Sequence, residues 1–212
     1  DKNRNMKKSD VVLREILCSY MDGVNRFTQL YLSKKLGFSL STVNASIKRL
    51  EEIGAVALKK RGFYMADFYK ALVFFATKRD LKRDVVYSTR INMSVRDIEK
   101  NLPDGVAFTA YTAYNLLFNE APADYSEVYV YADAEALGEI KIRFKQEKGP
   151  PNLIVLKPDV KLLLDIKGKK LKRSCVCPAQ LFADLWNINT WYAKEYVKAF
   201  ERMIEQYGIL EQ

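Results

Sequence analysis

The sequence has no histidine and only three cysteines among its 212 residues. Histidine is the commonest metal ligand and the commonest general base near neutral pH, so its absence weighs against many classes of enzyme. The cysteines are Cys18 and the pair Cys175 and Cys177, which are spaced one residue apart. An odd number of cysteines suits a reducing compartment, and we interpret all three as core residues in preference to metal or redox groups.

The sequence also lacks a long apolar run and the common phosphate-binding motifs. No stretch approaches the roughly 20 apolar residues needed to cross a bilayer, and the first residues lack the apolar core of a secretion signal. Neither a GxxxxGK[ST] loop nor the Gly-Ser segment and paired aspartates of nucleotidyltransferases is present. We therefore expect a cytoplasmic protein that is not an enzyme and has no cofactor, no metal and no membrane contact.

Positive charge is plentiful but unevenly distributed. The formal net charge is +9 at pH 7. Residues 1–66 hold 13 Lys or Arg against 6 Asp or Glu, whereas the remaining residues hold 22 against 20. An excess gathered in the first third of the chain favours a phosphate-binding surface over charge that serves only solubility.

Two helical patterns open this basic third. The segment 9–21 has apolar residues at three- and four-residue spacing, and Ser9 or Asp10 is available to cap its start. After a loop, Thr28 can cap a short second helix. That helix is expected to end at Gly37, where the chain needs a left-handed residue.

A third helix is predicted over 41–54, with Ser39 or Ser41 as its cap. Its predicted buried stripe is Val43, Ile47 and Leu50. The opposite face carries small, polar or basic side chains, namely Ser41, Thr42, Asn44, Ala45, Lys48 and Arg49. An asparagine can pair with an adenine edge, and the cations can reach guanine or phosphate. The alternative interpretation is an ordinary solvated helix face.

A β-hairpin with a basic tip is predicted over 55–68, because small or apolar residues alternate there and turn at Lys60, Arg61 and Gly62. Neighbouring cations at such a tip repel one another unless they face solvent or an anion, for example a phosphate backbone. The predicted DNA contacts are therefore Thr28, Gln29, Ser39, the six residues of the third helix face, Lys59, Lys60, Arg61 and Tyr64.

The order in which these helices, turns and hairpin follow one another along the chain is a distinctive pattern. A leucine-rich second helix is followed by Gly37, by Ser41-Thr42-Val43, and by the exit LEEIG into the hairpin. This order resembles the winged helix-turn-helix of bacterial and archaeal transcription regulators. The resemblance implies binding of double-stranded DNA, although some winged helices bind RNA or protein instead.

The expected fold class is α+β, with a winged helix-turn-helix over 6–68, a connecting helix and linker over 69–90, and a mixed domain for assembly or partner binding over 91–212. Helices of the last domain are expected at 94–102, 107–118, 177–186 and 191–208, and strands at 126–133, 152–159 and 161–168.

One nuclease-like pattern occurs in this domain, Pro158-Asp159 followed by Asp165-Ile166-Lys167. A metal-dependent nuclease needs its first acid and its D-x-K on adjacent strands, so that both carboxylates reach one metal. Five residues lie between the two acids, which is too few for two strands and a turn. We therefore interpret Asp159 and Asp165 as surface acids.

The segment AFTAYTAYNLL, the strand EVYVYAD and the terminal CPAQLFADLWNINTWYAKEYVKAF resemble the antitoxin and regulator half of AbiE-type (type IV) abortive-infection toxin-antitoxin pairs and related archaeal proteins. The resemblance implies a repressor that binds inverted repeats near its own promoter, with a nucleotidyltransferase-like toxin as partner. Two-fold repeats call for a homodimer. The candidate surface consists of Trp186, Trp191, Tyr192 and Tyr196. Core packing explains these aromatic residues equally well.

Two alternatives remain open. One is a nucleic-acid-processing enzyme, a nuclease or a nucleotidyltransferase-like protein, that uses a winged helix for targeting. The other is a winged-helix module that binds protein.

Overall fold

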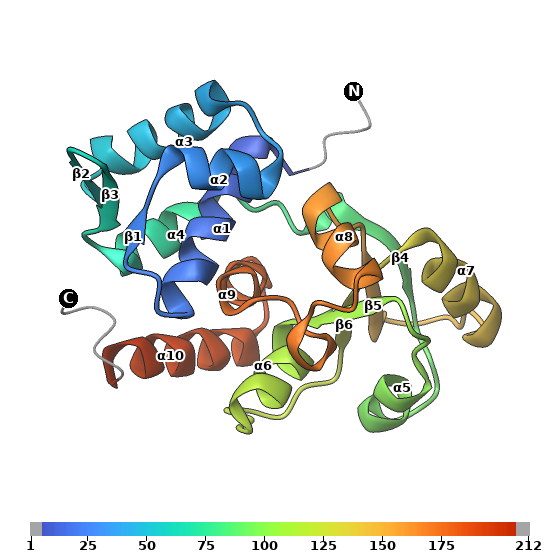
Figure 1. The fold of residues 1–212 in the computed structure, drawn as a ribbon. Coiled ribbons are helices and arrows are strands. Elements are labelled where there is room, and N and C mark those ends of the chain that lie inside the picture. Colours follow the sequence, from blue (N-terminus) through green and yellow to red (C-terminus); the bar gives the residue numbers. More distant parts are fainter. Residues whose placement is uncertain (1–5, 207–212) are drawn as a thin grey trace. The chain divides into compact units, whose positions relative to one another are not determined.

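The computed structural model describes residues 6–206, which divide into two compact units (Figure 1). Of the described residues, the first unit comprises 6–79 together with 200–206, and the second comprises Asp80–Ala199. This division differs from the domain limits expected from the sequence, because the helix after the hairpin belongs to the first unit. Between residues 6 and 206, no helix is both long and apolar enough to span a membrane.

Four helices form most of the first unit: α1 (Lys8–Met21), α2 (Gln29–Leu36), α3 (Leu40–Glu52) and α4 (Phe68–Lys78). The apolar stripes predicted for the first and third helices are buried in this unit, where α1 packs against α3 and α4. Tyr20 of α1 stacks on Phe68 of α4, with ring centroids 5.2 Å apart. Burial of these aligned apolar faces is the main force that holds the helices together.

Local capping signals start α2 and α3 and end α2 as predicted, whereas α3 spans Leu40–Glu52 and not 41–54. The side chain of Thr28 accepts a hydrogen bond from the backbone N–H of Tyr31 at 3.1 Å, and Gly37 ends α2 with φ 67°. Ser39 caps α3 by accepting from the N–H of Thr42 at 3.3 Å. The expected cap of α1 by Ser9 or Asp10 is wrong, because the helix begins at Lys8 and both residues lie inside its first turn.

A small antiparallel sheet completes the first unit, with β1 (Arg26–Phe27), β3 (Gly62–Met65) and β2 (Val56–Lys59) in that order. Lys59 pairs with Gly62, so the hairpin turn is formed by two residues and Gly62 already lies in a strand. Gly62 has φ 142°, and a Cβ at this position would overlap the carbonyl oxygen of Phe27 on β1. Only glycine therefore allows the close approach of β1 to β3.

The second unit is built on a four-stranded sheet in the order β4 (Val85–Thr89), β7 (Leu153–Leu156), β6 (Val128–Ala132) and β5 (Val106–Thr109). The central pair β6 and β7 is parallel, and the two outer pairs are antiparallel. Its helices are α5 (Val95–Asn101), α6 (Ala110–Phe118), α7 (Ala134–Arg143), α8 (Val160–Lys167) and α9 (Pro178–Trp186), and α10 (Trp191–Gln206) begins in it.

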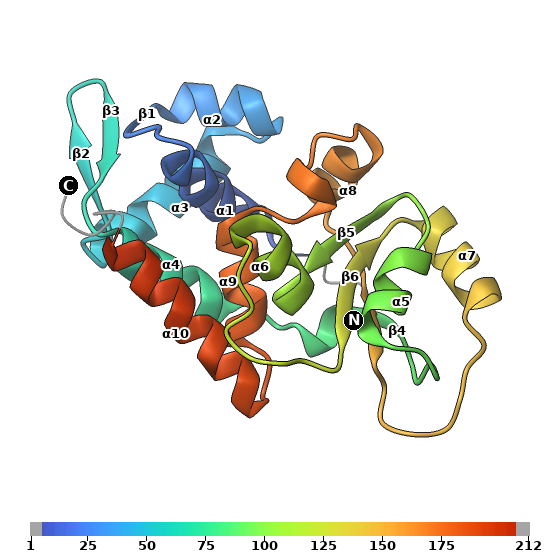
Figure 2. The same ribbon diagram turned by 90° about the horizontal axis from the view of Figure 1, so that it is seen from below.

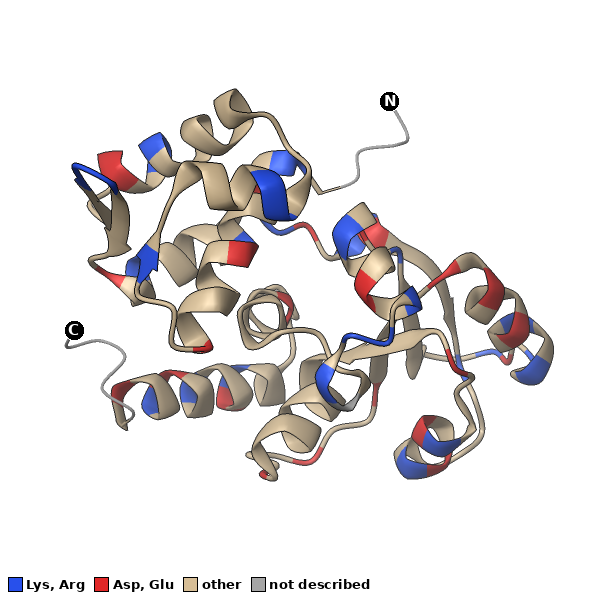
Figure 3. Ribbon diagram, viewed as in Figure 1, with Lys and Arg blue, Asp and Glu red and all other residues tan. Residues whose placement is uncertain are grey.

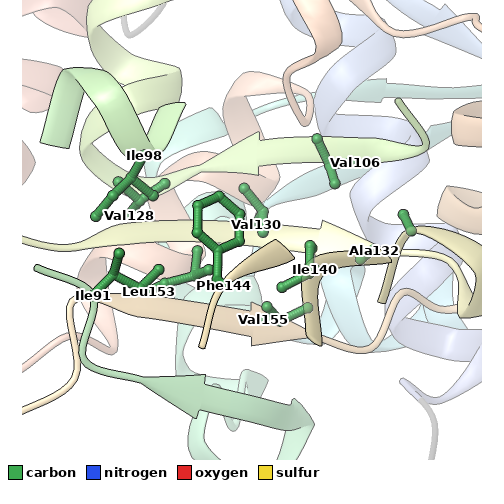
Figure 4. Close-up of a cluster of buried hydrophobic side chains, with 11 residues drawn as sticks. Ile91, Ile98, Val106, Val128, Val130, Ala132, Ile140, Phe144, Leu153 and Val155 are labelled. Carbon is green, nitrogen blue, oxygen red and sulfur yellow. The ribbon is translucent and has the colours of Figure 1, made fainter. Parts of the chain in front are cut away.

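Helices cover both faces of this sheet (Figure 2). On one face, Val128 and Val130 of β6 pack in a buried cluster with Ile98 of α5 and Ile140 of α7 (Figure 4). On the other face, the buried Tyr131 donates a hydrogen bond to Asp184 of α9 at 2.8 Å. Because side chains alternate along a strand, the valines of β6 lie on one face of the sheet and its tyrosines lie on the other.

Two segments of the second unit differ from the expectation. The sequence predicts one helix over 107–118, but the first residues of this segment form β5, and the chain turns at Ala110, which has φ 51°, into α6. The segment 161–168 is predicted as a strand but forms α8. Leu162 and Ile166 are buried four residues apart whereas Leu164 is exposed, which is a helical period hidden by three consecutive leucines.

Candidate nucleic-acid interface

The exposed face of α3 carries most of the side chains predicted to reach DNA. Ser41, Asn44, Ala45, Lys48 and Arg49 are exposed, and Thr42 is half-buried. The other side of the helix is anchored by its predicted stripe, each member of which is at most 1% exposed. The structure thus presents short polar and small side chains near the start of α3 and cations two turns into it.

Hydroxyl groups cluster at the start of α3. The Oγ atom of Ser39 lies 2.9 Å from Ser41 Oγ and 2.9 Å from Thr42 Oγ1. Ser39 and Thr28 also use their side-chain oxygens as helix caps. These two residues therefore have a structural role in the free protein, and their contacts with DNA stay a prediction.

A hydrogen bond joins the exposed ends of α2 and α3. The Nε2 atom of Gln29, the first residue of α2, donates to Oδ1 of Asn44 at 3.1 Å. Leu32 of α2 is fully buried, as is Val43 on the core side of α3, so the two helices are held close together at this point. Gln29 and Asn44 were predicted as separate DNA contacts on two helices, and the structure shows that their side chains meet.

The β2–β3 hairpin borders a hollow of about 520 Å³ that we call the basic hollow; its lining consists of Arg26, Lys59, Lys60, Arg61, Phe63 and Tyr64. Arg26 lies opposite Tyr64 in the pairing of β1 with β3. The Nζ atom of Lys59 lies 5.4 Å from the centre of the Tyr64 ring, a cation–π distance. Figure 3 shows the resulting positive charge at the hairpin turn and on β1.

Two exposed residues of this region were missed in the sequence. Arg26 stood in what looked like a loop, because a strand of two residues has no periodicity that could reveal it. Leu40, the first residue of α3, is 49% exposed and precedes Asn44 by one helical turn. An apolar side chain at such a position can contact the methyl group of thymine.

An ion pair holds α2 on α1. The Nζ atom of Lys35 lies 2.6 Å from Oε1 of Glu15, and Ser19 Oγ donates to the same carboxylate oxygen at 3.0 Å. Burial lowers the pKa of Lys35, but its hydrogen bonds and charge interactions with Glu15 and with Tyr31 together outweigh this effect, so the pKa is raised overall. Lys35 is thus a structural cation and not part of the predicted DNA surface.

The acids of the nuclease-like pattern have structural partners, and the interpretation of Asp159 as a surface acid is wrong, because this residue is buried. Asp159 caps α8 by accepting from the N–H groups of Lys161 and Leu162, at 3.0 Å and 3.2 Å. Asp165 accepts from Lys161 Nζ at 2.6 Å one turn away. Within residues 6–206, no group of three or more Cys, Asp or Glu side chains is placed to hold a metal ion.

The aromatic residues considered for a dimer surface have different environments. Tyr196 is fully buried and donates to the carbonyl of Ala123 at 2.8 Å, so it is a core residue. Tyr192 donates to Glu127 at 2.6 Å. Trp191 is 68% exposed and Trp186 is 40% exposed, which leaves these two tryptophans as candidates for an interface.

Comparison with known proteins supports a DNA-binding role for the part of the first unit that contains α2 and α3. Residues 25–56 match a family model described as winged helix-turn-helix DNA-binding. The matched residues run from the loop before β1 to the start of β2 and include all of α2 and α3. No curated protein and no solved structure matches the chain at a significant level. The family match supports a DNA-binding regulator and leaves its biological role open.

Proposed function

We propose that this protein is a transcriptional repressor that binds double-stranded DNA through a winged helix-turn-helix in its first unit. In this proposal α3 enters the major groove and the β2–β3 hairpin is the wing. The observation that carries the proposal is the exposed face of α3, where Ser41, Asn44 and Ala45 precede Lys48 on a helix anchored by a fully buried stripe. Short side chains at the start of such a helix let its backbone approach the base edges.

The basic hollow supports the second half of the proposal. Four cationic side chains line it, from β1, from the end of β2 and from the hairpin turn. Like charges so close together repel one another, and phosphate oxygens would relieve that repulsion. We propose that Arg26, Lys60 and Arg61 hold the phosphate backbone while α3 reads the bases.

Salt dependence of binding tests the proposal. The affinity of the full-length protein for a fluorescent duplex from its own upstream region is measured by anisotropy over a series of salt concentrations. Each neutralised phosphate contributes about 0.9 to the slope of log affinity against log salt, so Lys60→Ala and Arg61→Ala should each reduce the slope by up to about that amount.

Lys145→Ala is the matched control, because it removes the same charge from an exposed position of the second unit. The control should leave the slope unchanged. Binding that does not weaken with salt, or equal effects of all three variants, would refute the proposed interface.

Inverted repeats require two copies of the reading helix, and we propose that the protein binds them as a homodimer. Support comes from the exposed Trp191 at the start of α10, which offers an apolar surface. Sedimentation of the protein with a duplex that carries two half-sites should give a complex with two chains per duplex. A complex with one chain would contradict the homodimer.

The resemblance to AbiE-type antitoxins supports a further role, that of antitoxin to a nucleotidyltransferase-like toxin. If a neighbouring gene encodes such a protein and its expression arrests growth, coexpression of this chain should restore growth. We also propose that the chain is not an enzyme. Metal-dependent DNA cleavage that disappears in Asp159→Ala or Asp165→Ala would establish the nuclease alternative instead.

A further inference from the structure

The hydrogen bond between Gln29 and Asn44 restricts how Asn44 can present its amide. Asn44 is an exposed residue of α3, and its Oδ1 accepts from Gln29 Nε2 at 3.1 Å. An isolated asparagine on a helix surface can rotate its amide freely, with the oxygen and the nitrogen exchanging places. Here that rotation breaks the bond unless the amide of Gln29, a half-buried residue at the start of α2, turns at the same time.

The restricted amide keeps a defined set of free hydrogen-bonding groups. A side-chain amide oxygen accepts two hydrogen bonds and its nitrogen donates two. With one position on Oδ1 taken by Gln29, Asn44 retains one acceptor position and both N–H donors side by side. In the major groove adenine offers N7 as acceptor and N6–H as donor, which complement one N–H and the free position on Oδ1 of Asn44. Guanine offers two acceptors, so it has no donor for Oδ1.

We infer that Gln29 is a positioning residue that holds Asn44 ready to read an adenine. Asn44 touches the base, and Gln29 acts through Asn44. The inference rests on the proposed function, because it assumes that α3 lies in the major groove. It predicts that one position of the binding site prefers adenine, and that the strength of this preference depends on a side chain of α2.

Selection from a random duplex library tests the inference, because the protein itself picks out the sequences that it binds. The full-length protein is the probe, and the readout is the ratio of adenine to guanine at each selected position. One bidentate contact discriminates between bases by about 5- to 150-fold, so Asn44→Ala should abolish the preference at one position. Gln29→Met, which keeps the length of the stem and removes the donor, should weaken the preference at that same position by about 2- to 10-fold.

Two further measurements separate positioning from a general loss of structure. Replacing the preferred adenine by 7-deazaadenine, which lacks the N7 acceptor, should weaken binding of the wild type and leave binding of Asn44→Ala unchanged. Lys34→Met, which changes an exposed residue of the same helix, is the matched control and should leave the base preference unchanged. Thermal unfolding by circular dichroism should show that the variants remain folded.

The outcomes distinguish the inference from the function on which it rests. If the wild type selects no sequence and binds no duplex, the proposed function fails. If it selects a motif whose adenine depends on Asn44 but not on Gln29, or a motif with no adenine that depends on Asn44, the inference is wrong while DNA binding stands.

Discussion

Replacing Gly62 by alanine should separate the hairpin from β1 and so remove the basic hollow. Its φ of 142° is a conformation that other residues adopt only with strain, which costs about 1–3 kcal/mol. The added Cβ also overlaps the carbonyl oxygen of Phe27, so β1 must move away from β3. That movement loses backbone hydrogen bonds worth about 1 kcal/mol each and the stacking of Phe27 on Phe63. We expect a total loss of about 3–5 kcal/mol in the free energy of unfolding.

Gly54→Ala is the matched control. Gly54 also has a positive φ, of 72°, but a Cβ there would have open space around it, so only the backbone strain of about 1–2 kcal/mol applies. Urea unfolding followed by circular dichroism gives both free energies, and anisotropy gives the affinity for duplex DNA. Equal stability of the two variants would refute the argument from the overlap. Unchanged DNA affinity of folded Gly62→Ala would show that the hollow does not contribute to binding.

Two predictions concern the second unit. The buried Asn152 accepts from the N–H of Ile91 at 2.7 Å and donates to its carbonyl at 2.9 Å, so Asn152→Ala should lower the free energy of unfolding by about 2–4 kcal/mol in urea titrations. The exposed Asn92→Ala should change it by less than about 0.5 kcal/mol. Burial, and then nearby glutamates, raise the pKa of Tyr125 and that of Tyr129 from 10.0 to about 12. Because the fold favours the protonated form, stability that is present below pH 10 should be lost as the pH rises to about 12, and the ultraviolet absorbance of tyrosinate should appear late for both residues.

The helices of the first unit could be predicted because their signals are local. The caps Thr28 and Ser39 and the left-handed Gly37 each act within a few residues of the helix that they limit. The exposed face of α3 followed from its apolar period alone. The burial of the stripe confirms that part of the interpretation, whereas the contacts of the face with DNA stay a prediction.

The features that could not be predicted depend on pairing across the chain. Arg26 becomes part of a site only because β1 pairs with β3, and Gln29 meets Asn44 only because α2 packs on α3. In the second unit, β5 has only four residues and continues directly into α6, and it is recognisable as a strand only through its pairing with β6. Such elements take their structure from tertiary contacts, which outweigh local preference in short segments.

The pairing of β4 has a consequence for the order in which the second unit can fold. Its neighbour in the sheet is β7, the last of the four strands to be synthesised, so the sheet cannot close until the chain beyond Leu156 has been made. The strands of the first unit all lie within residues 26–65 and can pair much earlier. Folding that depends on distant pairing is slow, and an unpaired strand edge favours association with other chains. We therefore expect a protease added during synthesis to find residues 6–79 of the first unit protected while β4 is still open.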